Sequence, residues 1–168
     1  EILRGESLKQ LNERSADLYI TTLAPENAIH GRFLLDVDFV PVAKSDHPLF
    51  QLPAPLSAED LARFPLISVA DRRSQRTENR ATGQAANWTF TTVAAAMEAI
   101  SVGVGYGWLP LGSIEKVLES GVLSRLMLAA RTVRQTALYM VTDKESQNFD
   151  QTIGALSQCI LAECEVLP

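Results

Sequence analysis

The sequence predicts an α/β fold with largely parallel sheets. Short apolar runs that are typical of strands alternate with helix-like segments along the 168 residues. The last segment is the clearest helix, because apolar residues recur along it at spacings of three and four residues and form one face. These residues are Phe149, Ile153, Leu156, Ile160 and Cys164.

The first half of the chain contains several signals for element boundaries. Ser57 and Asp60 have the spacing of a capping box, which predicts the start of a brief helix. Proline and polar residues separate the apolar runs, as they do in turns. The elements expected here are a short helix with Leu8 and Leu11 facing inward, strands over residues 18–22 and 38–43, the helix after Ser57, and a strand over residues 66–70.

The motif GVGYGWLP at residues 103–110 raises the question of a phosphate-binding loop. The dinucleotide fingerprint requires a preceding strand and a glycine at its sixth position, which is Trp108 here. The residues before the motif favour a helix, with Thr92 as its N-cap and Gly103 in the left-handed position that follows a helix. Residues 106–110 are typical of a buried strand. The motif is therefore interpreted as a helix end, a glycine cap and a strand.

The remaining elements of the second half follow from similar signals. Residues 87–90 and 136–143 are predicted to be strands. A helix is expected around residues 113–118, with Gly121 as its cap. The longest irregular stretch, residues 71–87, is expected to be an exposed loop or hairpin.

The composition is that of a globular protein without a membrane span. Hydrophobic residues make up 46% of the chain, and no apolar run approaches about 20 residues. The net charge of −5 and the pI near 5.0 argue against a nucleic-acid-binding surface, which is usually basic. The N-terminus shows no signal-peptide pattern and begins without Met, so we expect a fragment of a cytoplasmic protein.

The sequence has no pattern typical of catalysis or of metal binding. Cys159 and Cys164 lie about 140° apart around the expected helix, so we expect buried thiols and no disulfide. His30 and His47 lie in a polar loop and a proline turn, and neither matches a catalytic motif. We therefore predict a protein that is not an enzyme and that uses neither a metal nor another cofactor.

The chain contains, in this order, the segments LNERSADLYI, VPVAKSDHPLF, DLARFPLIS, AAAMEAISVGVGYGWLP, GVLSRL and TALYMVTD. Together they resemble the effector-binding domain of LysR-type transcriptional regulators, and the resemblance covers essentially the whole chain. It implies the type 2 periplasmic-binding-protein-like fold. In that fold two Rossmann-like α/β lobes are joined by two crossover strands, and a small effector binds between the lobes.

The resemblance also implies how the chain is divided. Lobe I would comprise residues 1–41 and 142–168, lobe II residues 44–137, and the crossover strands would lie near residues 42–43 and 138–141. A first strand-helix-strand unit of roughly 30 residues is missing, so lobe I is expected to be incomplete. The winged helix-turn-helix that binds DNA in the family is also absent. Because the family's domains pair, we expect a homodimer or a higher homo-oligomer.

The resemblance and the strand ends together indicate the effector-binding residues. Thr21 and Thr22 follow a strand at its carboxyl end, where α/β sheets bind ligands, and the alternative is a simple turn. Thr91 and Thr92 open a helix whose N-terminus favours an anionic group, and the alternative is helix capping alone. The other candidates are Ser68 and Asp71 at the end of a second strand, and Trp108, which could instead belong to the core.

The resulting prediction is the sensory domain of a bacterial LysR-type regulator. It would bind a small organic anion or an amino-acid-like effector, contact DNA only through the absent N-terminal domain, and have no membrane partner. The alternative is a solute-binding protein of a transporter, which shares the fold. A basic cluster is either a solvated loop or a guard that attracts an acidic effector. Its residues are Arg72, Arg73, Arg76 and Arg80.

Overall fold

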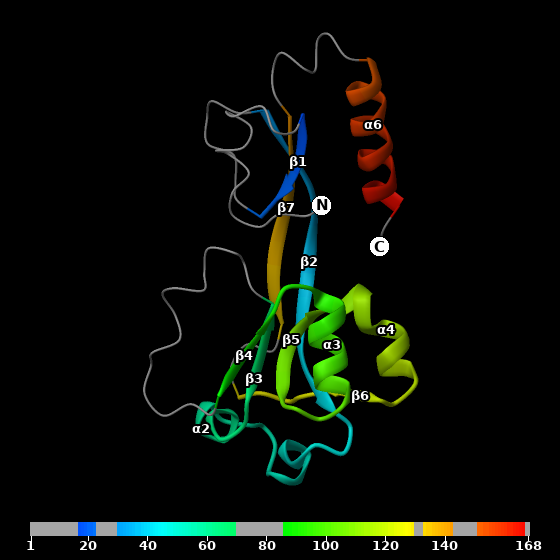
Figure 1. Cartoon of the computed structure of the whole chain (residues 1–168). Coiled ribbons are helices and arrows are strands. Elements are labelled where there is room, and N and C mark those ends of the chain that lie inside the picture. Colours follow the sequence, from blue (N-terminus) through cyan, green and yellow to red (C-terminus); the bar gives the residue numbers. More distant parts are fainter. Residues whose placement is uncertain (1–16, 23–29, 70–85, 130–132, 143–150, 167–168) are drawn as a thin grey trace. The chain divides into compact units, whose positions relative to one another are not determined.

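The computed structural model describes residues 17–22, 30–69, 86–129, 133–142 and 151–166 (Figure 1). The chain divides into two compact units. Unit 1 comprises Glu1–Val37 and Thr136–Pro168, and unit 2 comprises Asp38–Gln135. The chain passes from one unit to the other within two strands, β2 (His30–Lys44) and β7 (Arg134–Thr142). The assignment of these units to two lobes, with the boundaries expected from the resemblance, remains a prediction.

Unit 1 contains an antiparallel strand pair and a C-terminal helix. The strand β1 (Leu18–Thr21) pairs with the end of β7, and Tyr19 and Val141 in this pair are buried. The strand predicted over residues 18–22 is therefore confirmed. The strand predicted over residues 136–143 is also confirmed, and β7 begins two residues earlier than expected.

The helix α6 (Gln151–Val166) confirms the last predicted element but corrects its apolar face. Among its described side chains none is fully buried, and the half-buried ones include Ile153, Ile160 and Cys164, as expected. Leu156 is 51% exposed, because it lies about 60° around the helix from Ile153, outside the half-buried sector. Phe149, the fifth residue of the predicted stripe, lies outside the described residues.

The prediction of two buried thiols is wrong for Cys159. Its side chain is exposed, Cys164 is half-buried, and both thiols are free. The wide angle between the two positions explains the difference, since a helix that buries one face cannot cover both.

Unit 2 is built on a mixed sheet, so the expectation of largely parallel sheets is wrong for the described strands. The strand β3 pairs in parallel with both β4 and β5, whereas β2 pairs antiparallel with β5 and with β6. The antiparallel pairs arise because β2 enters the unit from unit 1 and runs against β5. The strands are β3 (Leu66–Val69), β4 (Asn87–Phe90), β5 (Tyr106–Pro110) and β6 (Leu123–Arg125).

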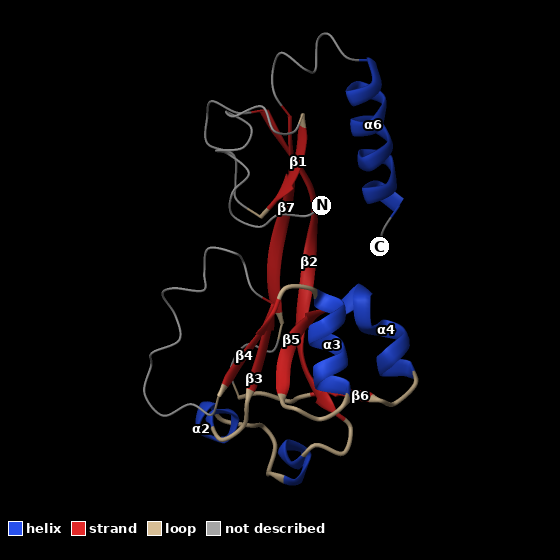
Figure 2. Cartoon of the chain, viewed as in Figure 1, coloured by secondary structure: helices blue, strands red, loops and turns tan. Residues whose placement is uncertain are grey.

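Each face of this sheet carries its own apolar cluster. Residues on one face, including Val40, Val42 and Leu109, pack against α3 (Val93–Ser101) and α4 (Leu111–Glu119), and Figure 2 shows these helices beside β5. Alternate residues face the other way. There Tyr106 joins the second cluster, which includes side chains from a 3-10 helix, η1 (Pro48–Gln51), and from α2 (Ala58–Ala62). The central strands are therefore covered on both faces.

The interpretation of GVGYGWLP is confirmed. The Thr92 hydroxyl accepts a hydrogen bond of 3.2 Å from the Ala95 amide and caps α3. Gly103 follows the helix with φ of +88°, a conformation that favours glycine. The strand β5 begins three residues later. The motif connects a helix to a central strand.

The capping box before α2 and the glycine after α4 are also found where the sequence predicts them. The capping box of α2 is present, because Ser57 Oγ accepts from the Asp60 amide at 3.2 Å and Asp60 Oδ2 accepts from the Ser57 amide at 3.0 Å. The helix α4 extends two residues before and one residue after the predicted range 113–118, and Gly121 beyond it has φ of +75°. The short strand β6 was not expected from the sequence. The predicted helix near Leu8, and nearly all of the irregular stretch 71–87, lie outside the described residues.

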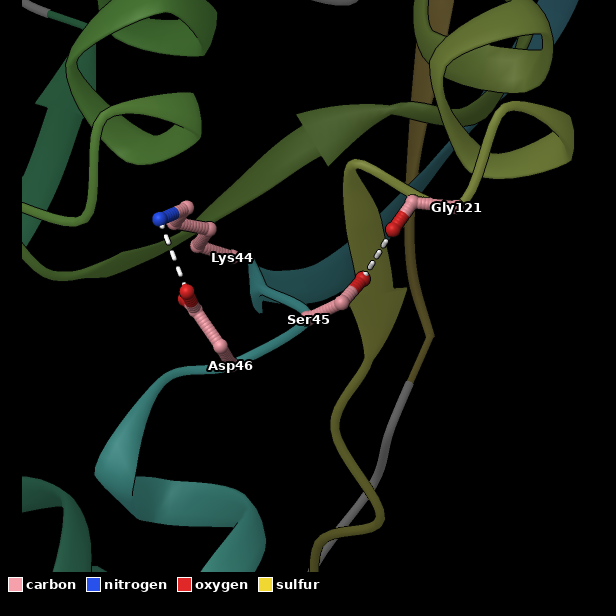
Figure 3. Close-up of polar contacts among 4 residues, drawn as sticks. All are labelled: Lys44, Ser45, Asp46 and Gly121. Atoms are coloured by element: carbon pink, nitrogen blue, oxygen red, sulfur yellow. Dashed lines mark hydrogen bonds and ion pairs between the residues drawn. The ribbon is translucent and has the colours of Figure 1, made fainter.

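The end of β2 is joined to the turn after α4 by a small polar cluster (Figure 3). Ser45 Oγ donates to the carbonyl oxygen of Gly121, and the Ser45 amide donates to Val122 at 3.0 Å. Beside it, Lys44 Nζ lies 2.8 Å from Asp46 Oδ2 at the exposed surface.

No helix among the described residues is long and apolar enough to span a membrane.

Gly107 permits the close approach of β5 to β3. It is buried opposite Ile67, and a Cβ atom there would overlap the Ile67 carbonyl oxygen and lie 3.1 Å from the Ile100 Cδ1 atom. Neither the strand backbone nor a fully buried side chain can move aside without disturbing its neighbours.

We therefore expect Gly107→Ala to lower the free energy of unfolding by about 1–3 kcal/mol through overpacking. Urea denaturation of the 168-residue chain measures this change. The matched control is Gly112→Ala in α4, where a Cβ atom meets nothing within 4 Å. It should leave stability unchanged or raise it by up to about 1 kcal/mol. Equal stabilities of the two variants would contradict the packing argument.

His47 is a buried cap rather than a surface group. Its Nδ1 accepts a hydrogen bond of 3.2 Å from the Leu49 amide at the start of η1. Its ring lies edge-on to Phe64, with ring centres 5.0 Å apart, and the residue is 5% exposed. Burial lowers the pKa of His47 from its ordinary value, and the negative charge of Asp46 opposes this shift.

This environment predicts a pH dependence of stability. Because the pKa of His47 is lower in the folded chain, the unfolded chain binds more protons just below pH ~6.5. The stabilising contribution is complete above that pH and is lost as the pH falls, since a protonated Nδ1 cannot accept from Leu49. Chemical denaturation at pH 7.5 and 5.5 should show this loss. The variant His47→Asn keeps an acceptor at the cap and does not titrate, so it should lose less stability over this range. An identical pH dependence in both proteins would refute the assignment.

Candidate functional site

Hydroxyl groups gather at the carboxyl ends of the parallel strands in unit 2. Ser68 in β3 pairs with Thr89 in β4, and their hydroxyl oxygens are 3.4 Å apart. Ser68 Oγ also lies 3.5 Å from the carbonyl oxygen of Trp88, at the limit of a hydrogen bond. Carboxyl ends of parallel strands are common ligand sites in α/β folds. Thr89 was not among the predicted residues, because its position beside Ser68 depends on the pairing of β3 with β4.

Thr91 and Thr92 connect β4 to α3 and are both exposed. The Thr92 hydroxyl caps the helix, so the capping interpretation is confirmed for this residue. Capping leaves other amides of the first turn without partners in the helix, and the helix dipole adds a partial positive charge there. A role of either threonine in effector binding stays a prediction.

Thr21 and Thr22 belong to unit 1, at the end of β1 and just after it. Thr21 is 2% exposed, whereas Thr22 is half-buried, so Thr22 is the more accessible of the two. Asp71 and the arginine cluster at residues 72–80 lie outside the described residues.

Trp108 lies in β5 on the face opposite α3. It is half-buried against the second apolar cluster, with its ring centre 5.9 Å from that of Tyr106. The Cζ atom of Arg134 lies 4.0 Å from the centre of the indole ring, in a cation–π contact. Trp108 Nε1 is buried and has no hydrogen-bond partner. Burial raises the pKa of Tyr106, and the positive charge of Arg134 opposes this rise.

Arg134 was missed by sequence reasoning, because no local pattern connects it to Trp108.

The described residues contain no group of three His, Cys, Asp or Glu side chains that could hold a metal ion. His47 uses Nδ1 to cap η1 and lies among apolar side chains, an arrangement that explains its burial without any catalytic role.

Similarity to known proteins identifies the type of domain. The family model described as LysR substrate binding domain matches residues 2–165. The probable HTH-type transcriptional regulator YhaJ of Escherichia coli K12 is 28% identical over 128 residues, which are 73% of this chain and 43% of that protein. The chain thus spans less than half the length of this curated relative.

Solved structures with low sequence identity share the fold. The C-terminal domains of a LysR family protein from Agrobacterium tumefaciens match with a TM-score of 0.77 and 16% identity, over 96% of this chain and 79% of that chain. ArgP from Mycobacterium tuberculosis matches with a TM-score of 0.76 and 19% identity, over 96% of this chain and 56% of that chain. Full-length LysG from Corynebacterium glutamicum with bound effector Arg matches with a TM-score of 0.72 and 16% identity, over 95% of this chain and 55% of that chain.

The mixed α/β architecture is therefore that of LysR regulatory domains, which resemble type 2 periplasmic-binding proteins. These domains bind effectors for transcriptional regulators and are not enzymes. The match over nearly the whole sequence shows that this chain belongs to the LysR substrate-binding domain family.

Proposed function

We propose that this chain is the sensory domain of a bacterial LysR-type regulator that acts in the cytoplasm. The observation that carries the proposal is the family match over residues 2–165. This match favours a regulator over the alternative, a solute-binding protein of a transporter. Effector binding would change how DNA-binding domains elsewhere in the protein are held. The net charge of −5 supports DNA contact through those other domains rather than through this chain.

The proposed effector is a small organic anion or an amino-acid-like molecule. The LysG structure that shares this fold contains an arginine effector, which supports an amino-acid-like ligand. The proposed contacts are largely hydroxyl groups and backbone amides, because both donate hydrogen bonds to a carboxylate. The contacting residues would be Thr21, Thr22, Ser68, Asp71, Thr91, Thr92 and Trp108.

We also propose that the regulator is a homodimer or a higher homo-oligomer. Several large apolar side chains are exposed in the described part of unit 2, among them Trp88 at 49% and Met127 at 68%. Exposed apolar side chains are typical of protein contacts when they are contiguous.

Self-association is tested by sedimentation. We expect the apparent mass of the chain to rise above 18.4 kDa as its concentration increases. A concentration-independent mass of one chain, up to the millimolar range, would contradict this prediction.

A thermal-shift screen of organic acids and amino acids should identify an effector. A ligand that binds only the folded state stabilises it by about 2.7 kcal/mol at 100 times its Kd. With that effector, Thr91→Val and Thr22→Val should each weaken binding roughly ten- to a hundredfold in calorimetry, the loss expected for a hydrogen bond to a charged group. Valine keeps the β-branched shape, so the unfolding temperature of the free chain should change little.

The control for these variants is Arg76→Ala in the arginine cluster. If that cluster is a solvated loop, the variant binds the effector with nearly normal affinity. Normal binding by both threonine variants would overturn the proposed contacts. A regulator domain that binds no small molecule of any class in the screen would count against the proposed function itself.

A further inference from the structure

Three polar side chains lie side by side on the sheet face of unit 2 that is opposite α3. In the parallel pair of β3 and β5, Leu66 is opposite Tyr106 and Ile67 is opposite Gly107. The next residues along the two strands are Ser68 and Trp108, which share a face with Leu66 and Tyr106. Ser68 is in turn paired with Thr89. The row of Trp108, Ser68 and Thr89 therefore crosses three strands near their carboxyl ends.

The row contains a buried hydrogen-bond donor that has no acceptor. Trp108 Nε1 can only donate, and it is buried without a partner. A buried N–H group without an acceptor is costly, and such groups are rare in folded proteins. The contacts of Ser68 Oγ, at 3.4 and 3.5 Å, are at the long limit for hydrogen bonds. An oxygen supplied by a ligand would satisfy both groups.

Arg134 adds a positive charge to this row. Its guanidinium group lies over the indole ring of Trp108, with Cζ 4.0 Å from the ring centre. The residue is exposed, and no ion pair with an acidic side chain is found for it among the described residues. A guanidinium group can bind a carboxylate in a bidentate manner through its N–H groups.

We propose that Arg134, Trp108 and Ser68 form a subsite that binds the carboxylate of the effector, and that Arg134 makes the domain selective for anions. The inference rests on the proposed effector-binding function and names the chemical group bound within it. Arg134 donates to both carboxylate oxygens, and Trp108 Nε1 and Ser68 Oγ donate to one of them. The long exposed side chain of Arg134 adjusts its rotamer as the anion enters. The subsite is distinct from the N-terminus of α3, which begins directly after Thr92.

The indole N–H of Trp108 provides a direct test by NMR. The chain has two tryptophans, Trp88 and Trp108, so its 15N spectrum contains two indole signals, and Trp108→Phe assigns them. The 168-residue chain is titrated with sodium acetate against sodium chloride at equal ionic strength. We expect acetate alone to move the Trp108 signal downfield in a saturable way, because Nε1 gains an acceptor. The Trp88 signal should not follow the same curve.

Two variants separate binding by Arg134 from simple packing on the ring. Arg134→Gln removes the charge and should weaken acetate binding about tenfold or more. Arg134→Lys keeps the charge without the planar fork and should bind acetate with an intermediate affinity. The matched control is Arg125→Gln at an exposed position in β6, which should bind acetate normally. The Trp108 signal of each free variant, together with its unfolding temperature, shows that the fold is intact.

Several results would overturn the subsite. They are an acetate shift that does not saturate, an equal shift in chloride, or unchanged acetate binding by Arg134→Gln.

Failure of the subsite is distinguishable from failure of the proposed function. If an effector from the thermal-shift screen stabilises the wild type and Arg134→Gln equally, the subsite is wrong and the sensory function stands. If acetate binds as expected and no metabolite does, the subsite stands without the proposed function.

Discussion

The structure of unit 2 depends on the close contact between β3 and β5. The strand β5 pairs with β2 on one side and β3 on the other, and apolar clusters cover both of its faces. This contact requires the absence of a side chain at Gly107. It also positions the proposed ligand-binding groups, because Ser68 and Trp108 lie on these two strands. Packing in the core and placement of the site therefore have the same physical basis.

The sequence was most informative where a local interaction determines the structure. Thr92 and Ser57 begin helices because their side chains accept backbone hydrogen bonds nearby, and such interactions need no distant partner. The left-handed conformation of Gly103 likewise depends only on its position just after a helix. Strand direction is not local. The mixed sheet arises because β2 extends over fifteen residues and runs against β5, and nothing within β2 signals its partner.

The same distinction applies to the candidate site. Ser68 and Thr91 could be predicted, since each directly follows or ends a recognisable strand. Thr89 and Arg134 could not, because their relevance depends on which strands pair and on a contact between distant parts of the chain. The exposure of Cys159 was also missed, since spacing along a helix gives the relative direction of residues but not which direction is covered.

A crystal structure of the chain with an effector found in the thermal-shift screen tests the central claim most directly. We expect the effector to bind at the carboxyl ends of β3, β4 and β5. Its carboxylate would lie within hydrogen-bond distance of Arg134 and Ser68, and its remaining polar groups would contact Thr91 or Thr92. An effector bound elsewhere, for example along α6, with these side chains in contact with solvent alone, would contradict the account.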